Sequence, residues 1–205
     1  MGSAFCRLYA DRYRIAAVHG RRAPKAEVLA LQADLARPGE IERVVQSTLD
    51  EFGAIDLLVN AAVSYVLAPA LEEKTLASLE AQFAVNLFAP LRLAAEVARR
   101  FWRGREDENR ARNRNLVNVS SLSGSHVYAN RGQGAYSASK AALEMLTRHL
   151  AAELQPLGVR ANVSAPNGFP RIVSTESVAA SIVKLDQGAM SGKVLSVDRG
   201  GETLR

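Results

Sequence analysis

The chain has little that could hold it together by covalent bonds or metal ions. Cys6 is the only cysteine among 205 residues, so no disulfide framework is available and a reducing cytoplasm is the simplest compartment. The three histidines are scattered, and together with one cysteine they give no metal-ligand spacing. No apolar run approaches the roughly 18 residues of a membrane helix, and arginines interrupt the first residues. We therefore expect no metal site, no membrane span and no signal peptide.

Positive charge is in slight excess, at +5, and it is unevenly placed. Residues 99–114 carry seven arginines, but acidic residues at 106–108 interrupt them. Mixed signs indicate a solvated helix end and loop, so we expect no nucleic-acid partner. Apolar residues make up 48% of the chain and charged residues 23%, which is typical of a globular protein of one domain.

Strands and helices alternate along the chain. Short apolar runs predict strands at 15–18, 28–31, 55–59, 116–119, 159–163 and 193–197. Amphipathic stretches predict helices at 3–12, 38–52, 76–102, 134–154 and 175–185, the third of them kinked at Pro90. The alternation predicts a single α/β domain over residues 1–205, with a doubly wound parallel sheet between two helical layers in a three-layer αβα arrangement.

Small or polar residues follow four of the predicted strands. They are Asp34, Asn60-Ala61-Ala62, the segment 120–124, and the segment 165–168, which contains Pro166 and Asn167. Because parallel strands deliver their carboxyl ends to one edge of the sheet, we expect these segments to line one crevice.

Tyr136 and Lys140 stand four residues apart in a predicted helix, on one helical face. A phenol with a pKa near ~10 is a poor acid or base at neutral pH. An ammonium group one turn away favours the phenolate, so we expect it to lower the pKa of Tyr136 and make the phenol usable for proton transfer.

Five segments resemble the short-chain dehydrogenase/reductase family, and the resemblance runs from Gly2 to Gly201. They are Leu57–Ala62, Val85-Asn86-Leu87, Val117–Gly124, Tyr136-Ser137-Ala138-Ser139-Lys140 and Val197–Gly201. Ala61 and Val63 depart from the family pattern in the first segment, and Arg199 is inserted in the last. The resemblance implies a Rossmann-like fold and an oxidoreductase that interconverts a small ketone and an alcohol.

The resemblance also implies roles for individual residues. Tyr136 would be the general acid or base, and Lys140 would bind the nicotinamide ribose. Asn86 would anchor a water that relays protons to Lys140. Ser121 would hydrogen-bond the substrate carbonyl. Ser123 remains the alternative, because its distance from Tyr136 is the more usual one in the family, although a short insertion in the following loop would explain the difference.

For the cofactor we predict NADPH rather than NADH. Arg21 and Arg22 follow the first predicted strand, where an acidic residue would hold the ribose 2′-hydroxyl of NAD, and basic residues suit a 2′-phosphate. Asp34 and Leu35 would flank the adenine. Asn60, Ala61, Pro166 and Asn167 would complete the cofactor site with Tyr136 and Lys140.

Three parts of the family pattern are lacking. The resemblance implies a first strand and a Gly-rich phosphate loop before Gly2, a helix between Arg22 and Glu27, and a substrate loop between Pro166 and Glu176, and the sequence shows none of the three. Without the first strand, its two neighbours in the sheet lose their shared partner.

Three interpretations of these gaps stay open. The sequence lacks segments that the protein has, or the chain is a non-catalytic relative that acts as an oligomerisation or scaffold partner, or it is a compact enzyme with a rearranged sheet. The family implies a homodimer or homotetramer formed through the helices at 76–102 and 134–154.

Overall fold

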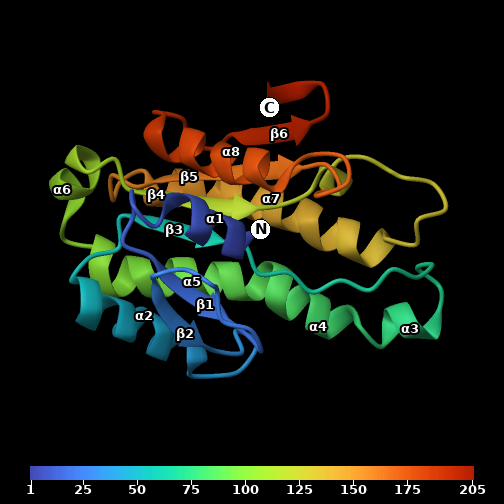
Figure 1. The fold of residues 1–205 in the computed structure, drawn as a ribbon, viewed down its shortest axis with the longest axis horizontal. Coiled ribbons are helices and arrows are strands. Elements are labelled where there is room, and N and C mark those ends of the chain that lie inside the picture. The colour runs from blue at the N-terminus through green and yellow to red at the C-terminus, as the bar shows by residue number, and fades with distance from the viewer.

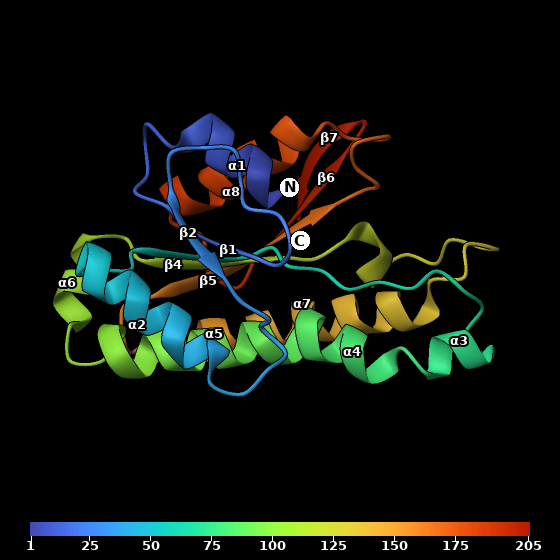
Figure 2. The same ribbon diagram turned by 60° about the horizontal axis from the view of Figure 1, so that its bottom comes forward.

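Helices cover both faces of a sheet layer in the computed structural model, which describes residues 1–205 (Figures 1 and 2). On one face lie α1 (Gly2–Tyr9) and α8 (Thr175–Gln187); on the other lie α2 (Glu40–Phe52), α5 (Ala89–Val97) and α7 (Gly134–Leu154). The predicted α/β architecture with a parallel sheet is confirmed. None of the helices combines the length and the hydropathy that a membrane span requires.

Five strands form the larger sheet, in the order β3 (Leu57–Asn60), β4 (Asn115–Val119), β5 (Arg160–Pro166), β6 (Val194–Asp198) and β7 (Gly201–Leu204). The first four are parallel, and each lies within three residues of its predicted position. The antiparallel edge strand β7 was not predicted. Its four exposed residues follow Gly200 and contain no apolar run.

The remaining two strands, β1 (Ala16–His19) and β2 (Leu29–Gln32), form a separate parallel pair. Neither is hydrogen-bonded to the five-stranded sheet, so the single continuous sheet that we predicted is divided between β1 and β3. The division falls at the position from which the sequence lacks a strand, where each neighbour has lost its backbone partner.

The long helix predicted at 76–102 is helical without interruption from Leu79 to Trp102, although it is not α-helical throughout. It comprises α4 (Leu79–Phe83), a π-helical turn (Ala84–Phe88), α5 and a second π-helical turn (Ala98–Trp102), and the short α3 (Glu73–Leu76) precedes it. The hydrogen-bond pattern changes immediately before Pro90, because proline cannot donate a main-chain hydrogen bond. The short α6 (Glu106–Ala111) was also not predicted.

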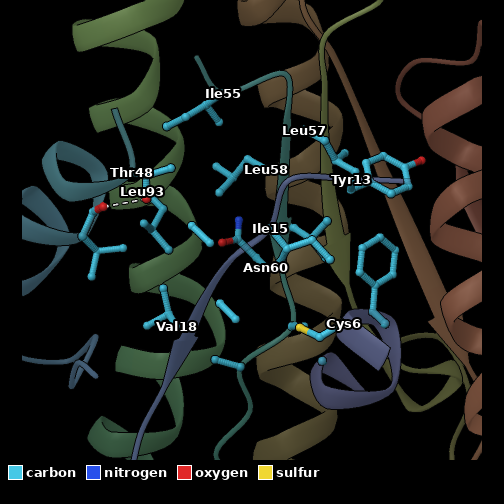
Figure 3. Close-up of a pocket in the computed structure, with 18 of the residues that line it drawn as sticks. Cys6, Tyr13, Ile15, Val18, Thr48, Ile55, Leu57, Leu58, Asn60 and Leu93 are labelled. Atoms are coloured by element: carbon cyan, nitrogen blue, oxygen red, sulfur yellow. Dashed lines mark hydrogen bonds between the residues drawn. The ribbon is translucent and has the colours of Figure 1, made fainter. Parts of the chain in front are cut away.

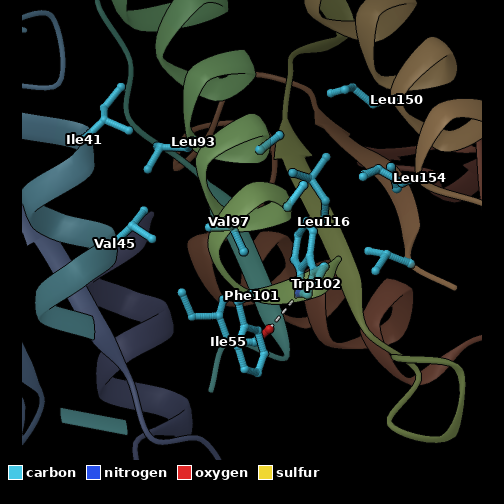
Figure 4. Close-up of a cluster of buried hydrophobic side chains, with 14 of the residues drawn as sticks. Ile41, Val45, Ile55, Leu93, Val97, Phe101, Trp102, Leu116, Leu150 and Leu154 are labelled. Atoms are coloured by element: carbon cyan, nitrogen blue, oxygen red, sulfur yellow. Dashed lines mark hydrogen bonds between the residues drawn. The ribbon is translucent and has the colours of Figure 1, made fainter. Parts of the chain in front are cut away.

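Two apolar clusters fill the space on the two faces of the sheet. In β4, Leu116 points into the cluster under α2, α5 and α7, whereas Val117 and Val119 point into the cluster under α1 and α8. Figure 4 shows the first cluster, in which Trp102 is fully buried and its indole Nε1 donates to the carbonyl oxygen of Ile55 at 2.9 Å. Coverage of both faces explains why every residue of β4 is buried.

Candidate active site

The carboxyl ends of the parallel strands meet at one edge of the five-stranded sheet. Asn60 at the end of β3 is opposite Asn118 in β4, and its Nδ2 donates to the Asn118 Oδ1 at 2.8 Å. Beyond β4, the Ser120 amide donates to the Ser164 carbonyl of β5 at 2.8 Å. The chain after β4 therefore leaves the sheet in a fixed direction, toward the first turns of α7.

Tyr136, Lys140 and Ser121 converge at this edge. The Lys140 Nζ lies 5.9 Å from the centre of the Tyr136 ring and donates to the Val119 carbonyl at 2.8 Å. The Ser121 hydroxyl lies beside the Tyr136 phenol, where it favours the ionised form of that phenol. One helical face thus holds the phenol and the ammonium group, and the end of β4 brings a hydroxyl to the phenol.

The pKa of Tyr136 shifts in the direction opposite to the one predicted from the sequence. Burial raises the pKa of Tyr136 above its ordinary value, and the neighbouring Ser121 hydroxyl only partly opposes the rise. The predicted lowering was wrong for this ligand-free chain, because loss of hydration outweighs the other influences on the phenolate. Burial also lowers the pKa of Lys140, to about 8. Near neutral pH the site therefore holds a protonated phenol and a buried ammonium group, and burial of that ammonium group lowers the stability of the folded chain.

Removal of the buried ammonium group is expected to stabilise the chain. Lys140→Met should raise the free energy of unfolding at pH 7 by about 1–3 kcal/mol, because the buried charge is lost while the methylene stem is kept. The folded pKa of Lys140 lies below the unfolded one. The unfolded chain therefore binds more protons between about pH 8 and 10.5, and wild-type stability gains from rising pH in that window.

Urea unfolding of both proteins at several pH values checks this prediction. The advantage of Lys140→Met should be largest below about pH 8 and should shrink toward pH 10.5. The exposed Lys184, paired with Glu202, provides the matched control, and Lys184→Met should change stability by less than about 0.5 kcal/mol. A Lys140→Met chain less stable than the wild type at pH 7 would contradict the inference that burial of the Lys140 ammonium group destabilises the folded chain.

Asn86 fixes the loop after β3 to α7. Its Nδ2 donates to the Ser64 carbonyl at 2.7 Å and to the Ser139 Oγ at 3.0 Å, and its Oδ1 accepts from the Ser64 amide at 2.9 Å. Asn86 is fully buried within the first π-helical turn. The wider turn therefore presents the carboxamide to two segments that flank Tyr136, and one lone pair of Oδ1 remains without a protein donor.

The two candidate serines occupy different environments. The Ser121 hydroxyl is the one that reaches Tyr136, and it also accepts a hydrogen bond from the Ser123 amide at 3.2 Å. Ser123 is buried in the short 3₁₀ turn Leu122–Gly124. The geometry therefore favours Ser121 as the partner of the phenol.

The residues predicted to contact the adenosine part of the cofactor are only partly brought together. Arg22 lines a cavity whose wall also includes Asn60 and Ala61, and both Arg21 and Arg22 are exposed. Asp34 forms an ion pair with Arg37 at 3.4 Å, and Leu35 packs against the apolar cluster under α2.

At the other end of the predicted cofactor site, β5 ends at the buried Pro166. Asn167 is held by its neighbours, because its Nδ2 donates to Asp198 at 2.9 Å and its amide donates to the Val197 carbonyl at 2.8 Å. The same Asn167 Oδ1 accepts from the Tyr128 hydroxyl at 3.3 Å. These contacts tie the loop before α7 to the ends of β5 and β6.

Two aromatic residues beside the site were not predicted from the sequence. The Tyr65 ring lies edge-on to the Tyr136 ring with centroids 6.1 Å apart, and Tyr65 is 60% exposed. Tyr128 lies in the loop that ends at Gly132, whose φ is +54° and where a Cβ would lie 2.7 Å from Ala68. Tyr65 is five residues beyond Asn60, and only this proximity to a matching segment could have identified it.

A cradle for a nicotinamide nucleotide is partly present in these residues. Lys140 uses one N–H on Val119, so two remain for ribose hydroxyls, and Tyr136 presents its hydroxyl beside Ser121. The guanidinium groups of Arg21 and Arg22 are free to meet a phosphate at the far end. The chemistry of these donors fits the ribose and phosphate groups of such a cofactor.

Comparisons with known proteins agree with this fold. The sequence model of the short chain dehydrogenase family matches residues 4–181. An uncharacterized oxidoreductase of Schizosaccharomyces pombe is 30% identical over 173 residues, which cover 81% of this chain and 62% of that protein. A sorbitol dehydrogenase of Cereibacter sphaeroides is 33% identical over 178 residues, or 81% of this chain and 65% of that enzyme.

Among solved structures, a short chain dehydrogenase from Burkholderia cenocepacia in complex with NADP superposes with a TM-score of 0.81 at 25% identity. The match covers 97% of this chain and 91% of that structure.

The fold is that of a Rossmann-like α/β domain. The chain belongs to the short-chain dehydrogenase/reductase family. It spans somewhat less than two thirds of the length of the two curated relatives described above.

Proposed function

We propose that the protein is an NADP-dependent oxidoreductase that transfers hydride between NADP(H) and a small ketone or alcohol, with Tyr136 as general acid and base. The convergence of Ser121 and Lys140 on the Tyr136 phenol carries the proposal. When bound, the reduced nicotinamide supplies the hydride. Side chains of this protein bind and orient the substrate and transfer the proton.

In the direction of reduction, the substrate carbonyl oxygen accepts hydrogen bonds from Ser121 and Tyr136. Tyr136 then donates its proton to this oxygen as negative charge develops there. The raised pKa of Tyr136 keeps the phenol protonated at neutral pH, as a proton donor requires. The Ser121 hydroxyl holds the carbonyl in line, and in the reverse direction the Tyr136 phenolate takes the proton of the alcohol.

Lys140 and Asn86 support the proton transfer. Lys140 donates its two remaining N–H groups to the ribose hydroxyls and stabilises negative charge on Tyr136. The free lone pair of the Asn86 Oδ1 binds a water that connects Lys140 to solvent. Since Asn86 also binds Ser64 and Ser139, it sets the positions of the segments on both sides of that water.

The experiment for the proposed function is NADPH consumption with a panel of ketones and aldehydes. Oxidation of NADPH matched by alcohol formation supports the proposal. NADPH bound by the chain but never consumed would instead favour a non-catalytic relative that serves as a scaffold.

Cofactor preference provides a separate prediction. The double variant Arg21→Ala/Arg22→Ala should weaken NADPH binding by about 10- to 100-fold, because two charge-assisted contacts to the 2′-phosphate are lost. NADH binding should change by less than about threefold, since NADH has no 2′-phosphate. Calorimetric titration of both proteins with both cofactors measures the four constants. Equal losses for NADPH and NADH would contradict the assignment.

The proposed substrate is a carbonyl compound with an apolar substituent. The segment after β3 exposes Val63 at 49%, and Tyr65 is exposed directly beside Tyr136. An aromatic edge and an aliphatic group at the entrance bind apolar substituents better than charged ones.

We also propose that two or four copies of the chain associate through α5 and α7. Phe88, Leu91 and Met145 are exposed on this layer, and a shallow groove between the two helices includes Leu91 and Leu154. A second copy of the same helical pair would cover these apolar side chains. The cytoplasm remains our predicted compartment, on the basis of the lone Cys6 thiol.

A further inference from the structure

Residues 63–67, which follow β3, have the side-chain pattern of a strand but belong to neither sheet. The first, third and fifth of them, Val63, Tyr65 and Leu67, are 49%, 60% and 54% exposed, whereas the two between are half-buried. Alternation with a period of two is the geometry of an extended chain. The cavity of about 750 Å³ between β1 and β3 is lined as far as Ala62 (Figure 3). Residues 63–67 do not line it and form a separate surface.

Two buried carboxamides take the place of a neighbouring strand for this segment. The Asn86 Oδ1 accepts from the Ser64 amide at 2.9 Å, and the Asn86 Nδ2 donates to the Ser64 carbonyl at 2.7 Å. The Gln82 Oε1 accepts from the Val66 amide at 3.3 Å. In a sheet, a neighbouring strand supplies such donors and acceptors to alternate residues. Both Asn86 and Gln82 are fully buried, so they form these bonds away from water.

The spacing of the two carboxamides matches that of the residues they bind. Gln82 and Asn86 are four residues apart on one face of a continuous helical run, which corresponds to ~6 Å along its axis. Ser64 and Val66 are two residues apart in an extended chain, which corresponds to ~6.7 Å. One face of the helix can therefore hold alternate residues of the segment, as a strand would.

The orientation of the Gln82 carboxamide is itself fixed. Its Nε2 donates to the Ser78 Oγ at 2.9 Å, and the Ser78 Oγ donates to the Thr75 carbonyl at 2.8 Å. Because Ser78 takes the amide end of the carboxamide, the oxygen end is directed to Val66. The hydrogen bonds of the Gln82 side chain thus serve the segment after β3, and none of them goes to Tyr136 or Lys140.

Tyr65 lies between the two residues that are held, so its side chain is directed to the exposed side of the segment. Its ring meets the Tyr136 ring with centroids 6.1 Å apart and planes inclined by 63°. With Val63 and Leu67 it forms an exposed apolar row beside Tyr136. Such a patch beside a reactive group is typical of a ligand-binding surface.

We propose that Gln82 is a positioning residue for Tyr65, and that Tyr65, held in this way, makes the site selective for carbonyl compounds with an aromatic substituent. A ring attached to the carbonyl carbon can pack on Tyr65 while the carbonyl oxygen meets the hydroxyls of Tyr136 and Ser121. A mobile Tyr65 would lose conformational entropy on each such contact, and the bond from Val66 to Gln82 restricts it beforehand. The inference deepens the proposed function and rests on it.

The position of Tyr65 is tested by NMR in the free protein, without cofactor or substrate. Gln82→Met keeps a long unbranched side chain but removes the acceptor of the Val66 amide. Hydrogen exchange of that amide should become at least about tenfold faster, and exchange of the Ser64 amide, which Asn86 holds, should change by less than about threefold. The nuclear Overhauser contact between the rings of Tyr65 and Tyr136 should weaken.

Gln46→Met is the matched control for this measurement. Gln46 is also a helical glutamine, but it lies on the exposed surface of α2 and binds Asp50. The substitution should change neither the exchange of the Val66 amide nor the ring contact.

Selectivity is measured as the ratio of kcat/KM for acetophenone to kcat/KM for butanone, with NADPH. Tyr65→Ala and Gln82→Met should each lower this ratio by about 3- to 10-fold and leave kcat/KM for butanone within about threefold of the wild type. In the Tyr65→Ala chain, Gln82→Met should lower the ratio no further, because Gln82 acts through Tyr65. A merely structural role of Gln82 would lower both values equally.

Unchanged exchange of the Val66 amide in Gln82→Met, equal losses for the two ketones, or a further loss in the double variant would each overturn the proposal. A wild type that reduces butanone but not acetophenone would overturn the selectivity. If the wild type reduces no ketone at all, the proposed function fails and the selectivity fails with it. The NMR measurements then still decide whether Gln82 positions Tyr65.

Discussion

Replacement of Tyr136 by phenylalanine should lower kcat for carbonyl reduction by about 100- to 10,000-fold and leave NADPH binding within about threefold of the wild type. The substitution removes one oxygen atom and keeps the ring that lies against Tyr65 and under the Lys140 ammonium group. General acid catalysis by a positioned side chain contributes about this much to a rate. Because Ser121 alone cannot supply the proton without a base beside it, little activity should remain.

Tyr128→Phe is the matched control for this variant. Tyr128 is a second tyrosine near the site, and its hydroxyl donates to Asn167 rather than pointing at Ser121. Its loss should lower kcat by less than about tenfold. Steady-state kinetics and NADPH titration of the two variants separate chemistry from binding. A Tyr136→Phe chain that keeps more than a tenth of the wild-type kcat would exclude Tyr136 as the proton donor.

Trp102→Ala should destabilise the fold by about 3–5 kcal/mol. Trp102 is fully buried in the cluster of Figure 4, next to Phe101 and Leu116, and its indole donates to the Ile55 carbonyl directly before β3. The truncation leaves a large cavity, and it also leaves that carbonyl without its donor. The effect should therefore lie at the upper end of the range for core substitutions.

Urea unfolding measures the loss of stability. The variant Trp102→Phe separates the contribution of packing from that of the hydrogen bond to Ile55. Phenylalanine keeps much of the packing but cannot donate to Ile55, so it should destabilise the chain by less than the alanine variant. Arg92→Ala on the exposed surface of α5 should change stability by less than about 0.5 kcal/mol. A loss below about 1 kcal/mol for Trp102→Ala would show that the cluster does not hold the helical layer to the sheet.

The elements that the sequence predicted well are those with a strong local pattern. The strands near 116–119 and 193–197 are mainly apolar and almost wholly buried, and α7 has a long helical pattern that ends before Pro156 and Gly158. The edge strand β7 was missed because pairing with β6, rather than its own residues, makes it a strand. The π-helical turn at 84–88 was missed for a similar reason, since Asn86 there binds Ser64 and Ser139, which are distant in sequence.

The candidate site shows the same division between local and tertiary information. The spacing of Tyr136 and Lys140 correctly predicted that both groups share a helical face, and the segment after β4 brings Ser121 to the phenol. The sign of the pKa shift of Tyr136 was wrong, because the sequence shows neighbours along a helix but not the burial that removes water from the phenol. The loss of a shared partner strand for β1 and β3 was predicted from the sequence, whereas the separation of the strands into two sheets was not.

The most direct test of the account follows hydride itself. The wild-type chain is incubated with a ketone that it reduces and with NADPH deuterated at the nicotinamide carbon that gives up hydride. We predict that deuterium appears on the carbinol carbon of the product at a rate that Tyr136→Phe lowers at least 100-fold. An alcohol formed without deuterium from the cofactor, or transfer unaffected by Tyr136→Phe, would contradict the central claim that this site performs hydride transfer coupled to proton donation by Tyr136.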